Sequence, residues 1–170
     1  MLKTFTPRGL IAMILVFAVA AALAIGVGRA QAQDNQESRT VHHAVGTFEV
    51  AVVPADPEVV EAGLGLSRYT LSKTFSGGMS GAAVGQMLAG GPSAQTGTYI
   101  ALERFVGALD GREGGFLLAH RGDMSPEGYS LAIMVVPNSG TGALAGIAGE
   151  FSLTIADGVH SYDLAYTLPQ

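Results

Sequence analysis

Three ionisable residues, Lys73, Glu103 and His120, lie at positions that the surrounding pattern marks as apolar. The segments RYTLSKTF (68–75) and YIALERFVGALDGREGGFLLAH (99–120) alternate polar and apolar residues, a pattern typical of half-buried β-strands. In this alternation the three residues share a face with aromatic and aliphatic side chains. A buried ammonium and a buried carboxylate are each costly unless they are paired. We therefore expect Lys73 and Glu103 to pair inside the molecule, with His120 beside them.

This predicted cluster suits two different roles. As a polar patch on the wall of a cavity, it would orient a small and mainly apolar ligand. His120 would then be the candidate acid or base, and Glu103 the residue that sets its tautomer. The other interpretation is a structural network that fixes the register of the strands, since ion-pair networks also occur without a function.

Two Asp-Gly turns predict the register of their strands. Asp110-Gly111 and Asp157-Gly158 each fit a two-residue hairpin loop, which fixes the pairs of facing residues. The first turn pairs Phe105 with Phe116, Glu103 with Leu118 and Ala101 with His120. The second turn pairs Phe151 with Leu164, Leu153 with Tyr162 and Ile155 with His160. Both hairpins place bulky apolar side chains on one face, as a core-facing sheet requires.

The opposite face of the first hairpin is predicted to be the exterior, because it carries two arginines. Its residues are Ile100, Leu102, Arg104, Val106, Leu117, Ala119 and Arg121. This face is unusually apolar for a solvated surface, which indicates either a subunit contact or a sheet covered by its own loops. The first alternative would make the protein a homo-oligomer.

Short segments rich in Val, Thr, Tyr, Phe and Leu recur along the chain, separated by Gly, Asn-Ser-Gly or Asp-Gly. We predict strands at 44–53, 65–76, 79–88, 96–109, 113–121, 128–136, 143–155 and 159–168. Their spacing predicts an all-β fold, a single closed or nearly closed antiparallel eight-stranded β-barrel. Only DPEVVEAG (56–63) is predicted to be helical, for a turn or two, with Asp56 as N-cap and Gly63 as the stop.

The N-terminal segment has the features of a secretory signal. Lys3 and Arg8 precede an apolar stretch over 10–27, and AQA at 30–32 offers small residues for cleavage after Ala32. The alternative is an uncleaved membrane anchor, because a stretch of about 18 apolar residues nearly spans a bilayer. We predict a signal peptide over 1–32, a disordered tether over 33–43 and the β-barrel domain over 44–170. The barrel is then exported, and is periplasmic, secreted or held on the outer side of a membrane.

Composition excludes several classes of function. The chain has no Cys, which excludes disulfides, a thiolate nucleophile, a lipoprotein anchor and a zinc site built on cysteine. Cleavage after Ala32 would remove 3 of the 9 basic residues and leave 6 against 14 acidic ones, a net charge of −8. Such a surface argues against nucleic acid and anionic membranes as partners. GTGALA (140–145) matches a dinucleotide fingerprint without its strand–helix context, so we expect no cofactor, and no spacing predicts a metal site.

The chain also resembles the bacterial family catalogued as domain of unknown function three-two-two-four, over Gly46 to Leu168. Three ordered stretches carry this resemblance: LSKTFSGGMSGAAVGQML (71–88), YIALERFVGALDGREGGFLLAHRG (99–122) and VVPNSGTGALAGIAGEFSLTI (135–155). The resemblance implies a compact antiparallel barrel related in shape to allene oxide cyclase, and it implies no established activity. The family pattern has its Lys, Glu-Arg and His at Lys73, Glu103-Arg104 and His120. The chain departs from that pattern at Gly78, Ala119 and Ala143.

These observations predict an exported barrel that binds a small hydrophobic molecule in its interior. The predicted ligand-binding residues are Lys73, Tyr99, Glu103, Phe116, His120 and Tyr162. One alternative is an acid–base isomerase or cyclase that uses the same cavity, with His120 and Glu103 as the catalytic candidates. The other is a structural or self-associating protein with a filled core, since a barrel of eight strands can be filled or hold one ligand.

Overall fold

The computed structural model describes residues 39–55, 59–61, 64–93 and 95–169, and over these residues the chain is all-β. The strands are β1 (His42–Pro54), β2 (Val59–Glu61), β3 (Leu64–Gly77), β4 (Met79–Ser93), β5 (Thr96–Leu109), β6 (Arg112–Ser125), β7 (Gly128–Val135), β8 (Thr141–Gly142), β9 (Ala148–Ala156) and β10 (Val159–Thr167). The predicted signal segment, with its cleavage after Ala32, lies outside the described residues. None of the described residues forms a helix that is long and apolar enough to cross a membrane.

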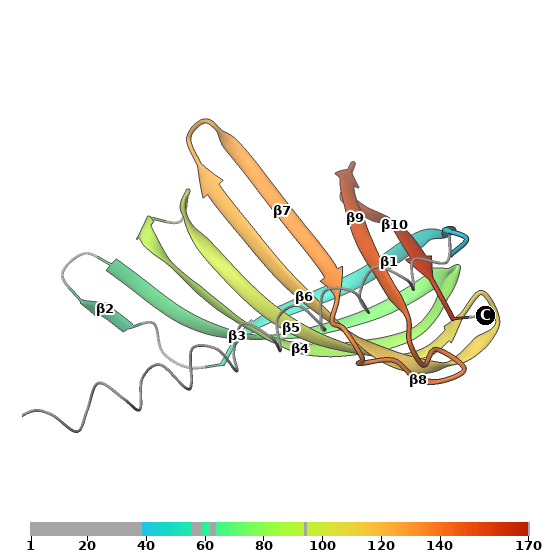
Figure 1. Cartoon of the computed structure of the whole chain (residues 1–170). Helices are drawn as coiled ribbons and strands as arrows, with labels where there is room; N and C mark the ends of the chain where they lie inside the picture. The colour runs from blue at the N-terminus through green and yellow to red at the C-terminus, as the bar shows by residue number, and fades with distance from the viewer. Residues whose placement is uncertain (1–38, 56–58, 62–63, 94, 170) are drawn as a thin grey trace, which may run out of the picture. The chain divides into compact units, whose positions relative to one another are not determined.

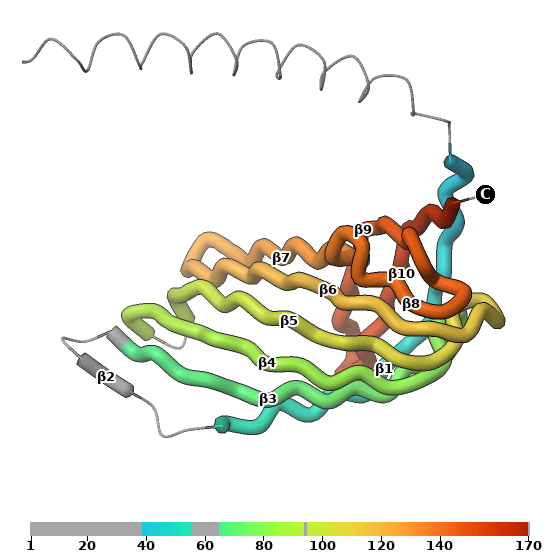
Figure 2. Tube along the Cα trace, turned by 60° about the horizontal axis from the view of Figure 1, so that its bottom comes forward, coloured from blue at the N-terminus to red at the C-terminus, as the bar shows by residue number. Residues whose placement is uncertain are grey.

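Eight of the strands close into the predicted antiparallel barrel. Neighbouring strands follow the order β1-β10-β9-β7-β6-β5-β4-β3, and β3 returns to pair with β1. β3 to β6 lie side by side as long, curved neighbours (Figure 1, Figure 2). The join between β7 and β9 is the thinnest part of the ring, because its ladder consists of the pair Met134 and Glu150. The two additional strands are short: β2 pairs with β3, and β8 pairs with β6.

Both predicted hairpin registers are confirmed. β5 and β6 pair Phe105 with Phe116, Glu103 with Leu118 and Ala101 with His120. β9 and β10 pair Phe151 with Leu164, Leu153 with Tyr162 and Ile155 with His160. Asp110 and Gly111 have φ of 47° and 79°, and Asp157 and Gly158 have 51° and 78°. Positive φ at both central residues is the conformation that an Asp-Gly turn between two twisted strands requires.

Two predicted elements are wrong. The helical turn over 56–63 is contradicted at residues 59–61, which form β2 on the edge of β3; its other residues lie outside the described part. A single helical turn is a costly nucleus, and β-branched Val59 and Val60 suit a strand. The bent strand over 143–155 begins only at Ala148, because residues 143–147 form turns that bury Leu144 and Ile147 in the core.

One end of the barrel is filled by aromatic rings. We call Phe75, Phe105, Phe116, Phe151 and Tyr162 the aromatic layer; all five are buried. Phe75 meets Phe105 and Tyr162 edge to face at centroid distances of 5.7 and 5.6 Å, and Phe151 stacks on Tyr162 at 5.3 Å. Rings at these separations attract one another beyond their area of burial. This end of the barrel is therefore a packed core.

Candidate functional site

Three long strands place their ionisable side chains on the inner face, one step beyond the aromatic layer. Lys73 lies two residues from Phe75 on β3, Glu103 two residues from Phe105 on β5, and His120 two residues from Leu118 on β6. Because side chains alternate between the faces of a strand, a step of two residues keeps each on the inner face. Their relative exposures are 9% for Lys73, 1% for Glu103 and 7% for His120. We call these three residues the polar layer.

Glu103 is the centre of the polar layer. Its Oε2 lies 2.7 Å from Lys73 Nζ and 3.4 Å from His120 Nε2. The contact with Lys73 is an ion pair, so Oε2 has a charged partner. Within the described part of the chain, Oε1 of Glu103 is buried with neither a hydrogen bond nor an ion pair, and Nε2 of His120 is buried without a hydrogen-bond partner. Buried polar groups of this kind are rare in native proteins, and each indicates a water, a ligand or a functional constraint.

Lys73 has a second stabilising contact from the aromatic side chains below it. Its Nζ lies 4.7 Å from the centroid of the Phe48 ring and 5.9 Å from that of Phe75. An ammonium over an aromatic face is attracted by the negative electrostatic potential of the ring. Phe48 reaches this position because β1 pairs with β3, where Val50 is opposite Lys73. Phe48 could not be predicted from the sequence, because that pairing joins strands from two different hairpins.

His120 is held in its neutral form. Burial first, and the nearby positive charge of Lys73 second, together lower its pKa to about 4. A neutral imidazole carries one proton on two nitrogens, so one nitrogen accepts and the other donates. The polar layer therefore combines the ion pair of Lys73 and Glu103 with a neutral imidazole.

Tyr99 lies further along the inner face of β5, two residues beyond Ala101. Its hydroxyl is 3.0 Å from that of Tyr129, and its ring packs against the backbone of Gly122, opposite it on β6. The pKa of Tyr99 is raised, first by burial, then by the hydrogen bond to Tyr129, with a smaller contribution from the negative charge of Glu103. Tyr99 is thus within electrostatic reach of the polar layer and partly open to solvent.

The other two predicted ligand-binding residues belong to the aromatic layer. The ring of Phe116 packs against Phe105 at a centroid distance of 5.2 Å. The hydroxyl of Tyr162 accepts a hydrogen bond of 2.7 Å from the backbone N–H of Met79 and lies 3.2 Å from the carbonyl of Ser76. The structure thus brings Lys73, Glu103 and His120 into contact and places Tyr99 nearby, while Phe116 and Tyr162 lie in the packed core.

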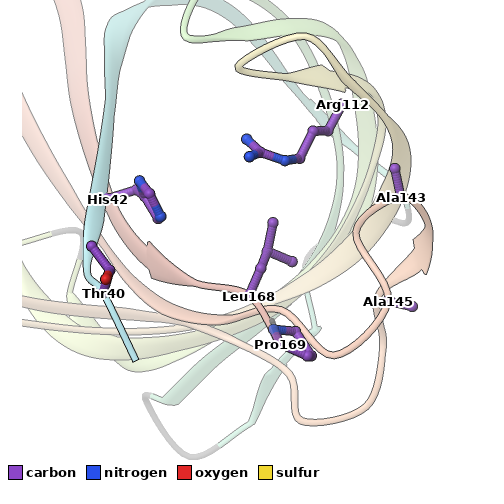
Figure 3. Close-up of a pocket in the computed structure, with 7 residues that line it drawn as sticks. All are labelled: Thr40, His42, Arg112, Ala143, Ala145, Leu168 and Pro169. Atoms are coloured by element: carbon purple, nitrogen blue, oxygen red, sulfur yellow. The ribbon is translucent and has the colours of Figure 1, made fainter. Parts of the chain in front are cut away.

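A separate hollow of about 280 Å³ lies near the start of β1 and the end of β10 (Figure 3). His42 and Arg112 point into it from opposite sides, above Leu168 and Pro169. The polar layer does not line this hollow, which therefore has no part in the predicted cluster. In the described part of the chain, no three His, Asp or Glu side chains gather in an arrangement that could hold a metal ion.

Comparison with known proteins agrees with the family resemblance in the sequence. The model of a family of proteins of unknown function, DUF3224, matches residues 44–166. A crystal structure of a DUF3224 protein of unknown function from Shewanella oneidensis MR-1 superposes with a TM-score of 0.71 at 32% sequence identity. The match covers 77% of this chain and 100% of that one. No curated protein matches the chain.

Proposed function

The chain belongs to the DUF3224 family of proteins of unknown function, and we propose that its barrel binds one small, mainly apolar molecule through the polar layer. The observation that carries this proposal is Oε1 of Glu103, an oxygen of a carboxylate with 1% exposure that has neither a hydrogen bond nor an ion pair within the described residues. Leaving a buried charged acceptor unsatisfied costs about 1–3 kcal/mol or more. A bound hydroxyl or N–H group would remove that cost.

The position of the polar layer supports a ligand at this point. On one side of the polar layer the interior is filled by the aromatic layer. On the other side the next inward residues, Leu71, Ala101 and Ile133, are still buried, and beyond them come the partly buried side chains of Tyr69, Met87, Tyr99 and Leu131. An apolar molecule lying on these residues would place its polar end against Glu103 and His120. Such sites combine apolar walls with a few polar groups that fix orientation.

The charges of the polar layer favour an uncharged ligand. Lys73 and Glu103 already compensate one another at 2.7 Å, and His120 is neutral. An additional buried charge would need a partner of its own, which is costly in this environment. We therefore propose a ligand with a hydroxyl or amide donor rather than a carboxylate or an amine.

Three probes of equal chain length test this proposal: 1-decanol, decanoate and decylamine. At a concentration near 100 times Kd, decanol should raise the melting temperature of the wild type by about 5–10 °C, and the two charged probes should have little effect. The double variant Lys73→Met/Glu103→Leu removes both charges and the acceptor together, so it should fold and lose the response. Glu150→Leu, at an exposed position on β9, should keep it. If no probe raises the melting temperature, or the double variant responds like the wild type, the proposal is wrong.

A second candidate function is favoured by the state of His120. His120 is in the unprotonated form that accepts a proton, with its Nε2 3.4 Å from the carboxylate of Glu103, although its lowered pKa makes it a weaker base than a free imidazole. The same pocket would then support acid–base isomerisation or cyclisation. If His120 is the proton acceptor, His120→Gln should retain the decanol response but abolish turnover of any substrate that the wild type converts. Undiminished turnover by His120→Gln would rule out this second function.

We also propose that the barrel is exported, on the evidence of residues 1–32 in the sequence. N-terminal sequencing of the protein recovered from outside the cytoplasm should give Gln33 as the first residue. Recovery of the intact N-terminus in the cytoplasm would contradict this proposal.

A further inference from the structure

The hollow of about 280 Å³ lies at the opposite end of the barrel from the polar layer (Figure 3). Along β6, Arg112 comes four residues before Phe116 of the aromatic layer, and His120 of the polar layer comes four residues after it. The packed rings therefore separate the two regions. The hollow is a second candidate site, and it is independent of the proposed function.

One wall of the hollow is fixed by the core of the barrel. Residues 143–147 form hydrogen-bonded turns, in which Leu144 and Ile147 are 0% and 1% exposed. The alanines of these turns line the hollow together with Pro169. Gly146 lies against Pro169, because a Cβ at this glycine would be 2.5 Å from the proline ring. The hollow is therefore preformed and apolar on this side, as ligand sites usually are.

Two nitrogen donors enter the hollow from opposite sides. Figure 3 shows the guanidinium of Arg112 on one side and the imidazole of His42 on the other, both directed toward the space between them. Neither side chain forms a hydrogen bond or an ion pair with another described residue, whereas Arg121 on the same strand as Arg112 is held by Asp123 at 3.0 Å. The N–H groups of both side chains are thus available to a bound molecule.

Asp110, the acidic residue of the adjoining turn, already has a partner. The hydroxyl of Tyr166 donates to its Oδ2 at 2.7 Å, and the ring of Tyr166 lies beside His42 at a centroid distance of 5.4 Å. Burial first, then the hydrogen bond and the negative charge of Asp110, together raise the pKa of Tyr166 to about 12, and the positive charge of Arg112 partly opposes them. Asp110 is therefore bound to a neutral hydroxyl, and Arg112 keeps its donors.

We propose that this hollow binds a tetrahedral oxyanion, a phosphate or sulfate group, between Arg112 and His42. The oxygens of such a group point in all directions, so it accepts hydrogen bonds from opposite sides at once. A carboxylate is planar and has both oxygens at one edge, which suits only one of the two donors. The guanidinium of Arg112 matches two oxygens through parallel N–H groups, and the imidazole N–H of His42 is placed for a third.

The surroundings favour an organic ester of this anion over the free ion. Leu168 and Pro169 lie beneath the two donors and provide an apolar surface for a small organic group. Sites for small molecules combine such walls with a few polar groups that fix orientation. The chain has a formal net charge of −5, so its surface as a whole does not attract anions, and binding here depends on Arg112 and His42 themselves.

Calorimetric titration of the full chain with phenyl phosphate and with inorganic phosphate, at one ionic strength set with NaCl, tests this proposal. Phenyl phosphate binds the wild type, and Arg112→Gln weakens this binding by about tenfold or more, because a charge-assisted hydrogen-bond pair is lost. Arg104→Gln is the matched control: it makes the same change at an exposed arginine on the outer face of β5 and keeps the wild-type Kd. Circular dichroism confirms that both variants are folded.

The two ligands identify the source of the anion. Tighter binding of phenyl phosphate assigns the hollow to an organic ester, and equal binding of both assigns it to the free ion. The proposal is overturned if neither ligand binds at ~10 mM, a concentration that would fill most of a site with a Kd of ~1 mM. It is also overturned if Arg112→Gln binds phenyl phosphate as tightly as the wild type. Lys73→Met/Glu103→Leu keeps phosphate binding, so this proposal and the proposed function can fail separately.

Discussion

The aromatic layer and the polar layer share the strands β3, β5 and β6, where they lie two to four residues apart, yet they differ in almost every physical property. In the aromatic layer the rings satisfy one another, and the hydroxyl of Tyr162 has backbone partners at 2.7 and 3.2 Å. In the polar layer Glu103 contacts Lys73 and His120, and Lys73 also lies over the ring of Phe48. Oε1 of Glu103 has no hydrogen bond or ion pair among the described residues.

This difference shows which part of the barrel is optimised for stability. A packed layer of rings contributes apolar burial and dispersion on every side. A buried ion pair contributes little net stability, because the loss of solvation offsets the attraction between the charges. A barrel selected only for stability would continue the aromatic layer by one more step. The interruption at Lys73, Glu103 and His120 is therefore the feature on which the proposed ligand site rests.

Removing a ring from the aromatic layer should cost the most stability. Phe105 is fully buried and touches both Phe75 and Phe116. Phe105→Ala should lower the free energy of unfolding by about 3–5 kcal/mol, from lost burial and the cavity left behind. Chemical denaturation measures this loss. Val106→Ala, one residue along and half exposed on the outer face, should change it by less than about 0.5 kcal/mol. Equal effects of the two substitutions would contradict the inward orientation of Phe105.

A smaller effect is expected from breaking the ion pair of the polar layer. Lys73→Met leaves the carboxylate of Glu103 buried without its cation, and should cost about 3 kcal/mol. Lys73→Met/Glu103→Leu removes both charges and should recover most of that loss. The double variant should therefore be more stable than Lys73→Met alone. Urea denaturation of the wild type, both single variants and the double variant measures the coupling. Additive effects would mean that the two side chains do not interact in solution.

Much of this architecture could be predicted from local sequence signals. The two Asp-Gly turns fix the hairpin registers, because only a two-residue loop with positive φ at both positions matches the strand twist. Those registers already place Glu103 and His120 on one face and Tyr99 opposite Gly122. Lys73 was found because it occupies an apolar position in its alternation, where an unpaired ammonium would be costly.

The parts that could not be predicted depend on contacts between distant segments. Phe48 lies beneath Lys73 only because β1 closes the ring against β3. Leu144 and Ile147 fill the core from the turns before β9, and the sequence alone does not separate these turns from the apolar residues of the strand that follows. β2 has no pattern of its own that distinguishes a short edge strand from a helical turn, and its state is decided by the free edge of β3. The contacts that complete each layer could not be deduced without knowing how the barrel closes.

The smallest of these effects is the pH dependence of stability. It distinguishes a desolvated histidine in the polar layer from an exposed one. The pKa of His120 is about 4 in the folded protein, below the 6.5 of a free imidazole. Between these two pH values the imidazole is protonated in the unfolded chain and neutral in the folded chain. Stability is unaffected by this group above pH 6.5 and is lost progressively as the pH falls from 6.5 to 4, by about 2–3 kcal/mol.

His120→Leu has no proton to take up, so its stability should fall less than that of the wild type over this pH interval. Denaturation of both proteins at pH 7 and at pH 4 measures the difference, in which the contributions of the shared acidic residues cancel. Lys73, Glu103 and Tyr99 face His120 and remain in both proteins. His43→Gln is the control: His43 is exposed and lies 2.9 Å from Asp163, so this substitution should leave the loss due to His120 in place. Identical losses in the wild type and His120→Leu would mean that the imidazole is hydrated and that the polar layer is open to water.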